Sequence, residues 1–183
     1  MDEPAAERTD AASESPLVPG REPSIRHVDD TDLPWEEFRR QRNADGSTSS
    51  VWEKWFAVSS DPPYLSIYAR YDPGMIVRRH GHYSPHVVFV LEGELWVGDT
   101  RCPPGTHIEL PFGAAFGPLR AGDTGAMLFE VMMGDPRSWG DQPEAFDAIL
   151  SEHDVTPLPV PPMAAPPAAM LKIVERPPGG WSR

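Results

Sequence analysis

Glycine, proline and aspartate divide the middle of the chain into short segments. Between residues 51 and 133 these breaks recur roughly every ten residues, a spacing typical of antiparallel sandwiches and barrels. Within the segments apolar and polar residues alternate, as in VWEKWFAV (51–58) and YLSIYARYD (64–72), which is the pattern of a strand with one buried face. Further segments of this kind span 76–82, 86–93, 94–99, 106–111, 114–119 and 126–133. The pattern predicts an all-β fold, a small antiparallel barrel or jelly roll.

The two ends of the chain differ from this region in composition. Residues 1–30 are acidic and show no hydrophobic periodicity, which predicts a disordered N-terminal tail. Residues 31–155 would form the barrel domain, flanked by short helices over TDLPWEEFRRQR (31–42), where Trp and Phe are three residues apart, and over FDAILSEH (146–153). Residues 156–183 are rich in proline, which predicts an extended arm packed along the surface.

Charge and cysteine content exclude several classes of partner and location. The 183 residues carry a formal net charge of −12 and no basic stripe, so nucleic acid and anionic membranes are not expected partners. No apolar run is long enough to span a bilayer, and the first 30 residues lack the basic and apolar regions of a secretory signal. Cys102 is the only cysteine, so no internal disulfide is possible, and we expect a protein of the reducing cytoplasm.

Three of the six histidines, His80, His82 and His86, lie within seven residues of one another. Side chains two apart on a strand point to the same face, so His80 and His82 can converge on one ion inside a barrel. A turn is expected at residues 83–85, after which His86 can also face inward. Neutral imidazole suits iron, zinc, nickel, copper and, less well, manganese. The spacing indicates a candidate metal site, although histidines on the surface beside a loop would give the same pattern.

These histidines sit in a framework of glycines and prolines that resembles the two signatures of the cupin superfamily. The first is matched by Gly74-x5-His80-x-His82-x3-His86-x6-Gly93, with His86 where the family usually has glutamate. The second is matched by Gly105-x5-Pro111-x-Gly113-x2-Phe116-x3-Arg120, with Phe116 and Arg120 where the family usually has histidine and asparagine. The resemblance covers roughly residues 50–135. It implies a cupin barrel, that is, a double-stranded β-helix, with short flanking helices.

Carried over residue by residue, the resemblance implies that His80, His82 and His86 hold one divalent metal ion, since Phe116 cannot ligate. Fe(II) is favoured, and zinc, nickel or manganese are alternatives. Three nitrogen ligands leave positions open for substrate or oxygen, and losing the carboxylate favours an anionic or enolate-forming ligand.

The predicted function is a metal-dependent enzyme acting on a small organic molecule, foremost an Fe(II) dioxygenase of a diketone or of a phenolic or carbonyl compound. One alternative is a metal-dependent lyase or isomerase, which would use the ion to polarise a carbonyl without consuming oxygen. Another is a non-catalytic cupin that binds a small molecule in a barrel that has lost its metal. By analogy with the family, the chain is also expected to form a homodimer, in which the C-terminal arm could be exchanged.

The candidates for lining the substrate pocket are the aromatic residues of the predicted strands, Phe116, Tyr64, Tyr68 and Trp96. On the segment 106–111, His107 and Glu109 alternate with Ile108 and Leu110. If the apolar pair faces the core, His107 and Glu109 face outward. In the opposite register they could supply a fourth ligand and a base. The first register fits the hydrophobic pattern better.

Overall fold

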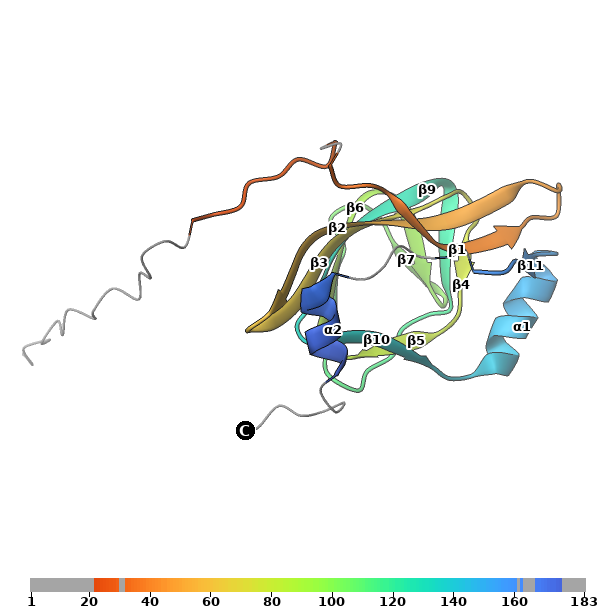
Figure 1. Ribbon diagram of the computed structural model, residues 1–183. Helices are drawn as coiled ribbons and strands as arrows, with labels where there is room; N and C mark the ends of the chain where they lie inside the picture. Colours follow the sequence, from red (N-terminus) through yellow and green to blue (C-terminus); the bar gives the residue numbers. More distant parts are fainter. Residues whose placement is uncertain (1–21, 30–31, 161, 163–166, 176–183) are drawn as a thin grey trace, which may run out of the picture.

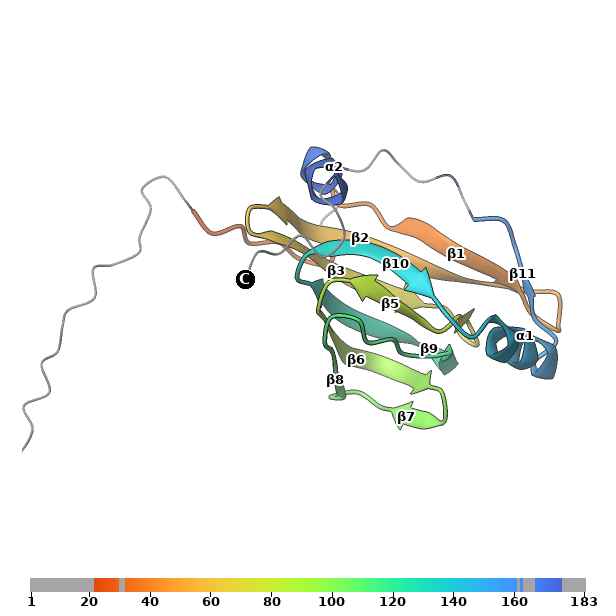
Figure 2. The ribbon, with the colours of Figure 1, turned by 90° about the horizontal axis from the view of Figure 1, so that it is seen from below.

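A computed structural model describes residues 22–29, 32–160, 162 and 167–175. A curved sheet of nine strands forms most of the molecule, and a two-stranded sheet covers its concave side (Figures 1 and 2). The predicted all-β barrel with antiparallel strands is therefore confirmed. Most of the expected tail, residues 1–21, lies outside the described residues. Neither helix in the described part of the chain has the length and apolar character needed to cross a membrane.

The strands are β1 (Glu36–Arg42), β2 (Thr48–Ser60), β3 (Pro63–Tyr71), β4 (Ile76–Val77), β5 (His80–Tyr83), β6 (His86–Val97), β7 (Thr100–Cys102), β8 (His107–Leu110), β9 (Leu119–Met132), β10 (Asp135–Gly140) and β11 (Thr156–Pro157), and the helices are α1 (Pro143–Glu152) and α2 (Ala168–Val174). The large sheet has the order β11-β1-β2-β3-β9-β6-β7, with β4 added beside β9 and β8 beside β6. Strands β10 and β5 form the small sheet.

Alternation along the strands separates an interior face from an outer face. On β3, Leu65, Ile67 and Ala69 are each at most 2% exposed, whereas the residues between them are partly buried. Strand β9 pairs with β3 and contributes Leu128 to the same interior. Burying a leucine or isoleucine side chain stabilises the fold by about 1.5–3 kcal/mol. These residues therefore stabilise the barrel around the site described below.

Strand β6 is one continuous strand, where the sequence predicted two, 86–93 and 94–99. Its register shifts around the signature glycine Gly93, so the chain passes through this point without a turn. Gly93 has a φ of 71°, and a Cβ here would lie 2.1 Å from the carbonyl oxygen of Gly125. Both the backbone conformation and the close approach of β9 therefore require glycine.

The structures predicted for the segments on either side of the barrel strands are partly wrong. Residues 36–42 of the predicted first helix form strand β1, which pairs with β2 on one side and β11 on the other. The helix predicted over 146–153 is confirmed as α1. The C-terminal arm is not simply extended, because it contains β11 and the helix α2. Met170 and Ile173 of α2 are buried against the barrel, where the helix contacts β2 and β10 (Figure 2).

Candidate functional site

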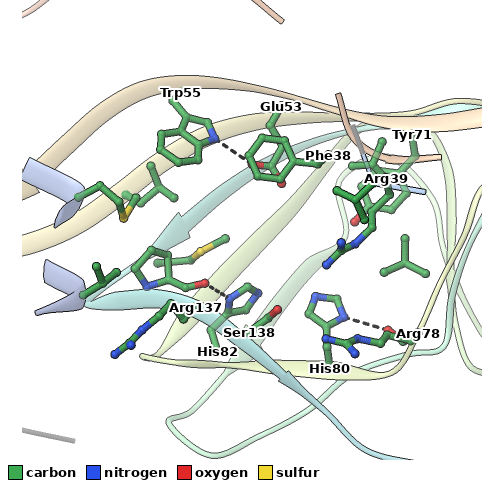
Figure 3. A pocket seen from close by; sticks show the side chains of 18 residues that line it. Phe38, Arg39, Glu53, Trp55, Tyr71, Arg78, His80, His82, Arg137 and Ser138 are labelled. Atoms are coloured by element: carbon green, nitrogen blue, oxygen red, sulfur yellow. Dashed lines mark hydrogen bonds between the residues drawn. The ribbon is translucent and has the colours of Figure 1, made fainter. Parts of the chain in front are cut away.

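A cavity of about 350 Å³ lies in the barrel between strand β2 and the small sheet (Figure 3). Much of its wall is apolar, including Phe38, Trp55, Leu65, Met132 and Met170. Its charged and histidine side chains are Arg39, Glu53, Arg78, His80, His82 and Arg137. The cavity therefore combines a hydrophobic wall with nitrogen ligands and charged groups, as expected of a site for a small organic molecule.

His80 and His82 both hold the tautomer that leaves Nε2 available. His80 Nδ1 is 3.0 Å from the carbonyl oxygen of Arg78, and His82 Nδ1 is 2.7 Å from that of Pro136. A carbonyl oxygen only accepts, so each Nδ1 carries the proton and donates it. Burial lowers the pKa of His80 and lowers that of His82 to about 4, which keeps both rings neutral at pH 7. Each Nε2 then has a lone pair free to bind a metal.

His86 lies deeper in the barrel and is paired with a carboxylate. It is 1% exposed, and its Nε2 is 2.9 Å from Oε2 of Glu130 on β9. Burial alone would raise the pKa of Glu130, but the hydrogen bond to His86 and the three nearby histidines lower it overall. Within the described residues, the buried Nδ1 of His86 has no hydrogen-bond partner. Histidines that bind a metal through one ring nitrogen commonly form a hydrogen bond to a carboxylate with the other, and His86 has the carboxylate and a free nitrogen.

Phe116 and Gly81 shape the histidine cluster. The Phe116 ring centre is 4.9 Å from that of His80 and 5.8 Å from that of His86, and its backbone forms two hydrogen bonds with His80. Gly81 stands between the two cavity histidines, where a Cβ would lie 2.3 Å from the carbonyl oxygen of Ala114 and 2.7 Å from Cζ2 of Trp139. An apolar ring thus closes one side of the cluster, and the backbone behind it is tightly packed.

The three histidines fit a metal by their chemistry and spacing. The ring centres of His80 and His82 are 5.3 Å apart, and those of His82 and His86 are 4.7 Å apart. Imidazoles bound about 2.1 Å from one ion have ring centres roughly 5 Å apart. No three His, Cys, Asp or Glu side chains in the described ranges already stand in metal-binding geometry. The rings therefore have to turn to share one ion.

Glu53 is a carboxyl in the cavity wall that sequence reasoning did not identify. Its Oε2 accepts a hydrogen bond of 2.9 Å from Nε1 of Trp55. Burial raises the pKa of Glu53 to about 8, with the Glu130 carboxylate adding to the effect and the Arg39 guanidinium opposing it. Glu53 is therefore mainly a neutral acid at pH 7, close enough to titration to exchange a proton.

Three residues predicted to line the pocket lie elsewhere. Tyr64 and Tyr68 are on the outer face of β3, where Tyr64 is 36% exposed and Tyr68 packs against the Phe56 and Phe129 rings. Trp96 is next to the buried Leu95 and faces outward, with the Arg120 guanidinium over its ring. The interior positions of these strands belong to the alternate residues, so only Phe116 of the predicted aromatic set reaches the site.

The register of β8 is the one that the hydrophobic pattern favoured. Leu110 is 4% exposed and Ile108 packs against the core, whereas His107 and Glu109 are exposed. Both therefore point away from the cavity, and neither can supply a ligand or a base there.

The fold has counterparts among solved structures, although no family model and no curated protein matches the sequence. A proposed acetylacetone dioxygenase from Methylibium petroleiphilum PM1 is 13% identical, with a TM-score of 0.51 over 76% of this chain and 90% of its own. An acetylacetone dioxygenase from Acinetobacter johnsonii is 14% identical, with a TM-score of 0.48 over 74% and 97%. An RmlC-like cupin from Ralstonia eutropha JMP134 is 13% identical, with a TM-score of 0.45 over 74% and 93%. The chain has a cupin fold. At these identities the likeness concerns the fold alone.

The cupin barrel contains functional candidates that the sequence signatures do not include. Glu130 alternates with the apolar Leu128 and Met132 on β9, and Glu53 lies between Val51 and Trp55 on β2. An acidic residue on the apolar face of a predicted strand is the signal that could have identified both. Arg39 had no such signal, because its strand was predicted as a helix.

Proposed function

We propose that this cupin is a metal-dependent enzyme acting on a small organic molecule. The observation that carries the proposal is the pair of cavity histidines whose Nδ1 atoms donate to backbone carbonyls, leaving both Nε2 atoms as free donors. His86, with its carboxylate partner and free Nδ1, provides the third nitrogen. This is the ligand set that the cupin signature implied.

Each side chain of the site has a distinct role in the proposal. A bound Fe(II) would supply the open positions at which a chelating substrate and oxygen meet. His80, His82 and His86 would hold it, and Glu130 would fix the orientation of the His86 ring. Phe116 beside the histidines and Trp55 on the facing wall would exclude water from the substrate, and Glu53 would give or take a proton.

Within this class, dioxygenation of a diketone or of a phenolic or carbonyl compound is the leading reaction. Three neutral nitrogen ligands leave room for a substrate bound through two adjacent oxygens. The Methylibium petroleiphilum protein of similar fold is described as a proposed acetylacetone dioxygenase, which makes that diketone the natural first compound to test.

A lyase or isomerase is the second candidate, and Glu53 favours it. An acid with a pKa near 8 beside a cavity is suited to moving a proton to or from a carbon next to a polarised carbonyl. Oxygen consumption distinguishes the two reactions, because only the dioxygenase needs it.

Metal content and oxygen uptake test the proposal. Tag-free protein, as purified and after reconstitution with Fe(II), is expected to contain close to one equivalent of metal by mass spectrometry. His82→Ala should lose most of it, and Glu130→Gln should weaken metal binding by about 10- to 100-fold. His107→Ala, on the outer surface, is the matched control and should retain it. Protein that binds no metal after reconstitution would contradict the proposal, and metal-loaded protein that converts a carbonyl compound without oxygen uptake would favour the second candidate.

A further inference from the structure

Two arginines at the edge of the cavity make no side-chain hydrogen bond or ion pair with any described residue. Arg39 on β1 and Arg78, just before β5, both line the cavity, and both are exposed enough to meet solvent. Figure 3 shows Arg39 descending from the β1 side and Arg78 beside His80 on the facing wall. Both also border a neighbouring hollow of about 280 Å³, so they occupy the same side of the barrel.

The neighbouring arginines are neutralised. Arg40 pairs with Glu37, Arg79 lies 3.1 Å from Asp141, and Arg137 pairs with Asp135. In a chain with a net charge of −12, carboxylates are plentiful. Arg39 and Arg78 line the cavity without forming an ion pair with any carboxylate of the described residues, so they stand out as binding groups.

A β-bulge directs Arg39 into the cavity. The β1–β2 register shifts between Glu37 and Arg39, so the intervening Phe38 has no direct partner. Consecutive strand residues normally point to opposite faces, yet Phe38 and Arg39 both line the cavity. Arg39 pairs directly with Val51, another lining residue. Bulges that re-aim a side chain are over-represented next to binding and active sites.

The interior carboxyls form hydrogen bonds with partners other than the two arginines. Glu130 lies with His86 deeper in the barrel, and Glu53, the one carboxyl among the described lining residues, is mostly protonated near pH 7. Trp55 lies across the cavity from the histidines (Figure 3), and Leu65 also lines the cavity, so the two favour an apolar or aromatic group.

We propose that Arg39 and Arg78 bind the carboxylate of the ligand, so that the substrate class is a small carboxylic acid with an apolar or aromatic body. The planar guanidinium groups match the geometry of a carboxylate. The body would lie against Trp55 and Leu65, and the reacting oxygens would face the histidines. This assignment rests on the proposed function for the reaction, but the arginine site itself does not require a metal.

The test compares phenylacetate with phenylacetamide, which has the same shape without the charge, by calorimetric titration at low ionic strength. The full chain is used both as purified and after treatment with a chelator. The acid is expected to bind at least tenfold more tightly than the amide in both samples, because charge-assisted hydrogen bonds are strong and are lost with the amide. The preference should fall about tenfold in Arg39→Gln and in Arg78→Gln. It should survive in Arg40→Gln and Arg79→Gln, which remove the same charge from the adjacent residue.

Equal affinity for acid and amide, or no binding of either, would overturn the assignment. A preference seen only before chelation would also overturn it, because the metal would then be the anion site. Tighter binding of phenyl phosphate than of phenylacetate would also overturn it, because the two arginines would then prefer a phosphoryl group to a carboxylate. Since the chelated protein contains no metal, these results are independent of the metal measurements above, and a failure of either proposal can be recognised separately.

Discussion

The Glu53 carboxyl in the cavity wall should make the stability of this barrel fall as pH rises. Its pKa is raised from 4.5 to about 8 in the folded protein, because burial disfavours the charged form. Between these two values the folded chain binds the proton more tightly than the unfolded chain, so the free energy of unfolding decreases with increasing pH. A difference of 3.5 units at about 1.4 kcal/mol per unit corresponds to about 5 kcal/mol once the group is fully ionised.

The variant Glu53→Gln isolates this contribution. The amide keeps an oxygen that can accept the Trp55 hydrogen bond but cannot ionise. The free energy of unfolding of the variant minus that of the parent should therefore increase by about 4 kcal/mol from pH 5 to pH 9. Other titrating groups, including the histidines, contribute to both proteins and largely cancel. Urea unfolding followed by circular dichroism at several pH values measures the difference.

Glu109→Gln is the matched control, because Glu109 is exposed on β8. The difference in free energy of unfolding between this variant and the parent should not change with pH. A difference in free energy of unfolding between Glu53→Gln and the parent that stays constant from pH 5 to pH 9 would refute the reasoning. Glu53 would then be ionised in the folded barrel, and its role as a neutral proton donor would fail with it.

Two further predictions concern ligation and assembly. Phe116→His places a fourth imidazole beside His80 and His86, so metal affinity should increase by tenfold or more. Competition with a chromophoric chelator measures the affinity. An unchanged affinity would mean that position 116 does not face the ion. The homodimer proposed from the family resemblance should give twice the chain mass by light scattering at micromolar concentration, and the mass of a single chain would contradict it.

Much of the fold and part of the site could be predicted from the sequence because strand periodicity is a local property. The two-residue spacing of His80 and His82 placed them on one face, and both line the cavity. The alternation of Ile108 and Leu110 gave the register of β8. The metal-ligand role of the histidines stays a prediction.

Other features depended on pairing between distant segments, which periodicity alone does not reveal. Trp35 and Phe38 are three residues apart, which suits a helix, but residues 36–42 gain more by pairing with β2 and β11. Tyr64 and Tyr68 of β3 could have faced either side, and the buried partners on β9 determine that Leu65 and Ile67 take the interior. The approach of Glu130 to His86 joins residues 44 positions apart, which no local pattern reports.

The bulge at Phe38 also bears on how such a barrel can change its ligand over evolution. Deleting one residue there would restore regular pairing with β2 and leave the rest of the sheet in place. The wall would then present either Phe38 or Arg39 to the cavity, but not both. A single-codon deletion could therefore remove the charge of Arg39 from the cavity edge, and leave that of Arg78, without altering any residue of the histidine cluster. In this wall, the length of a strand as well as its composition determines which molecules the barrel can accept.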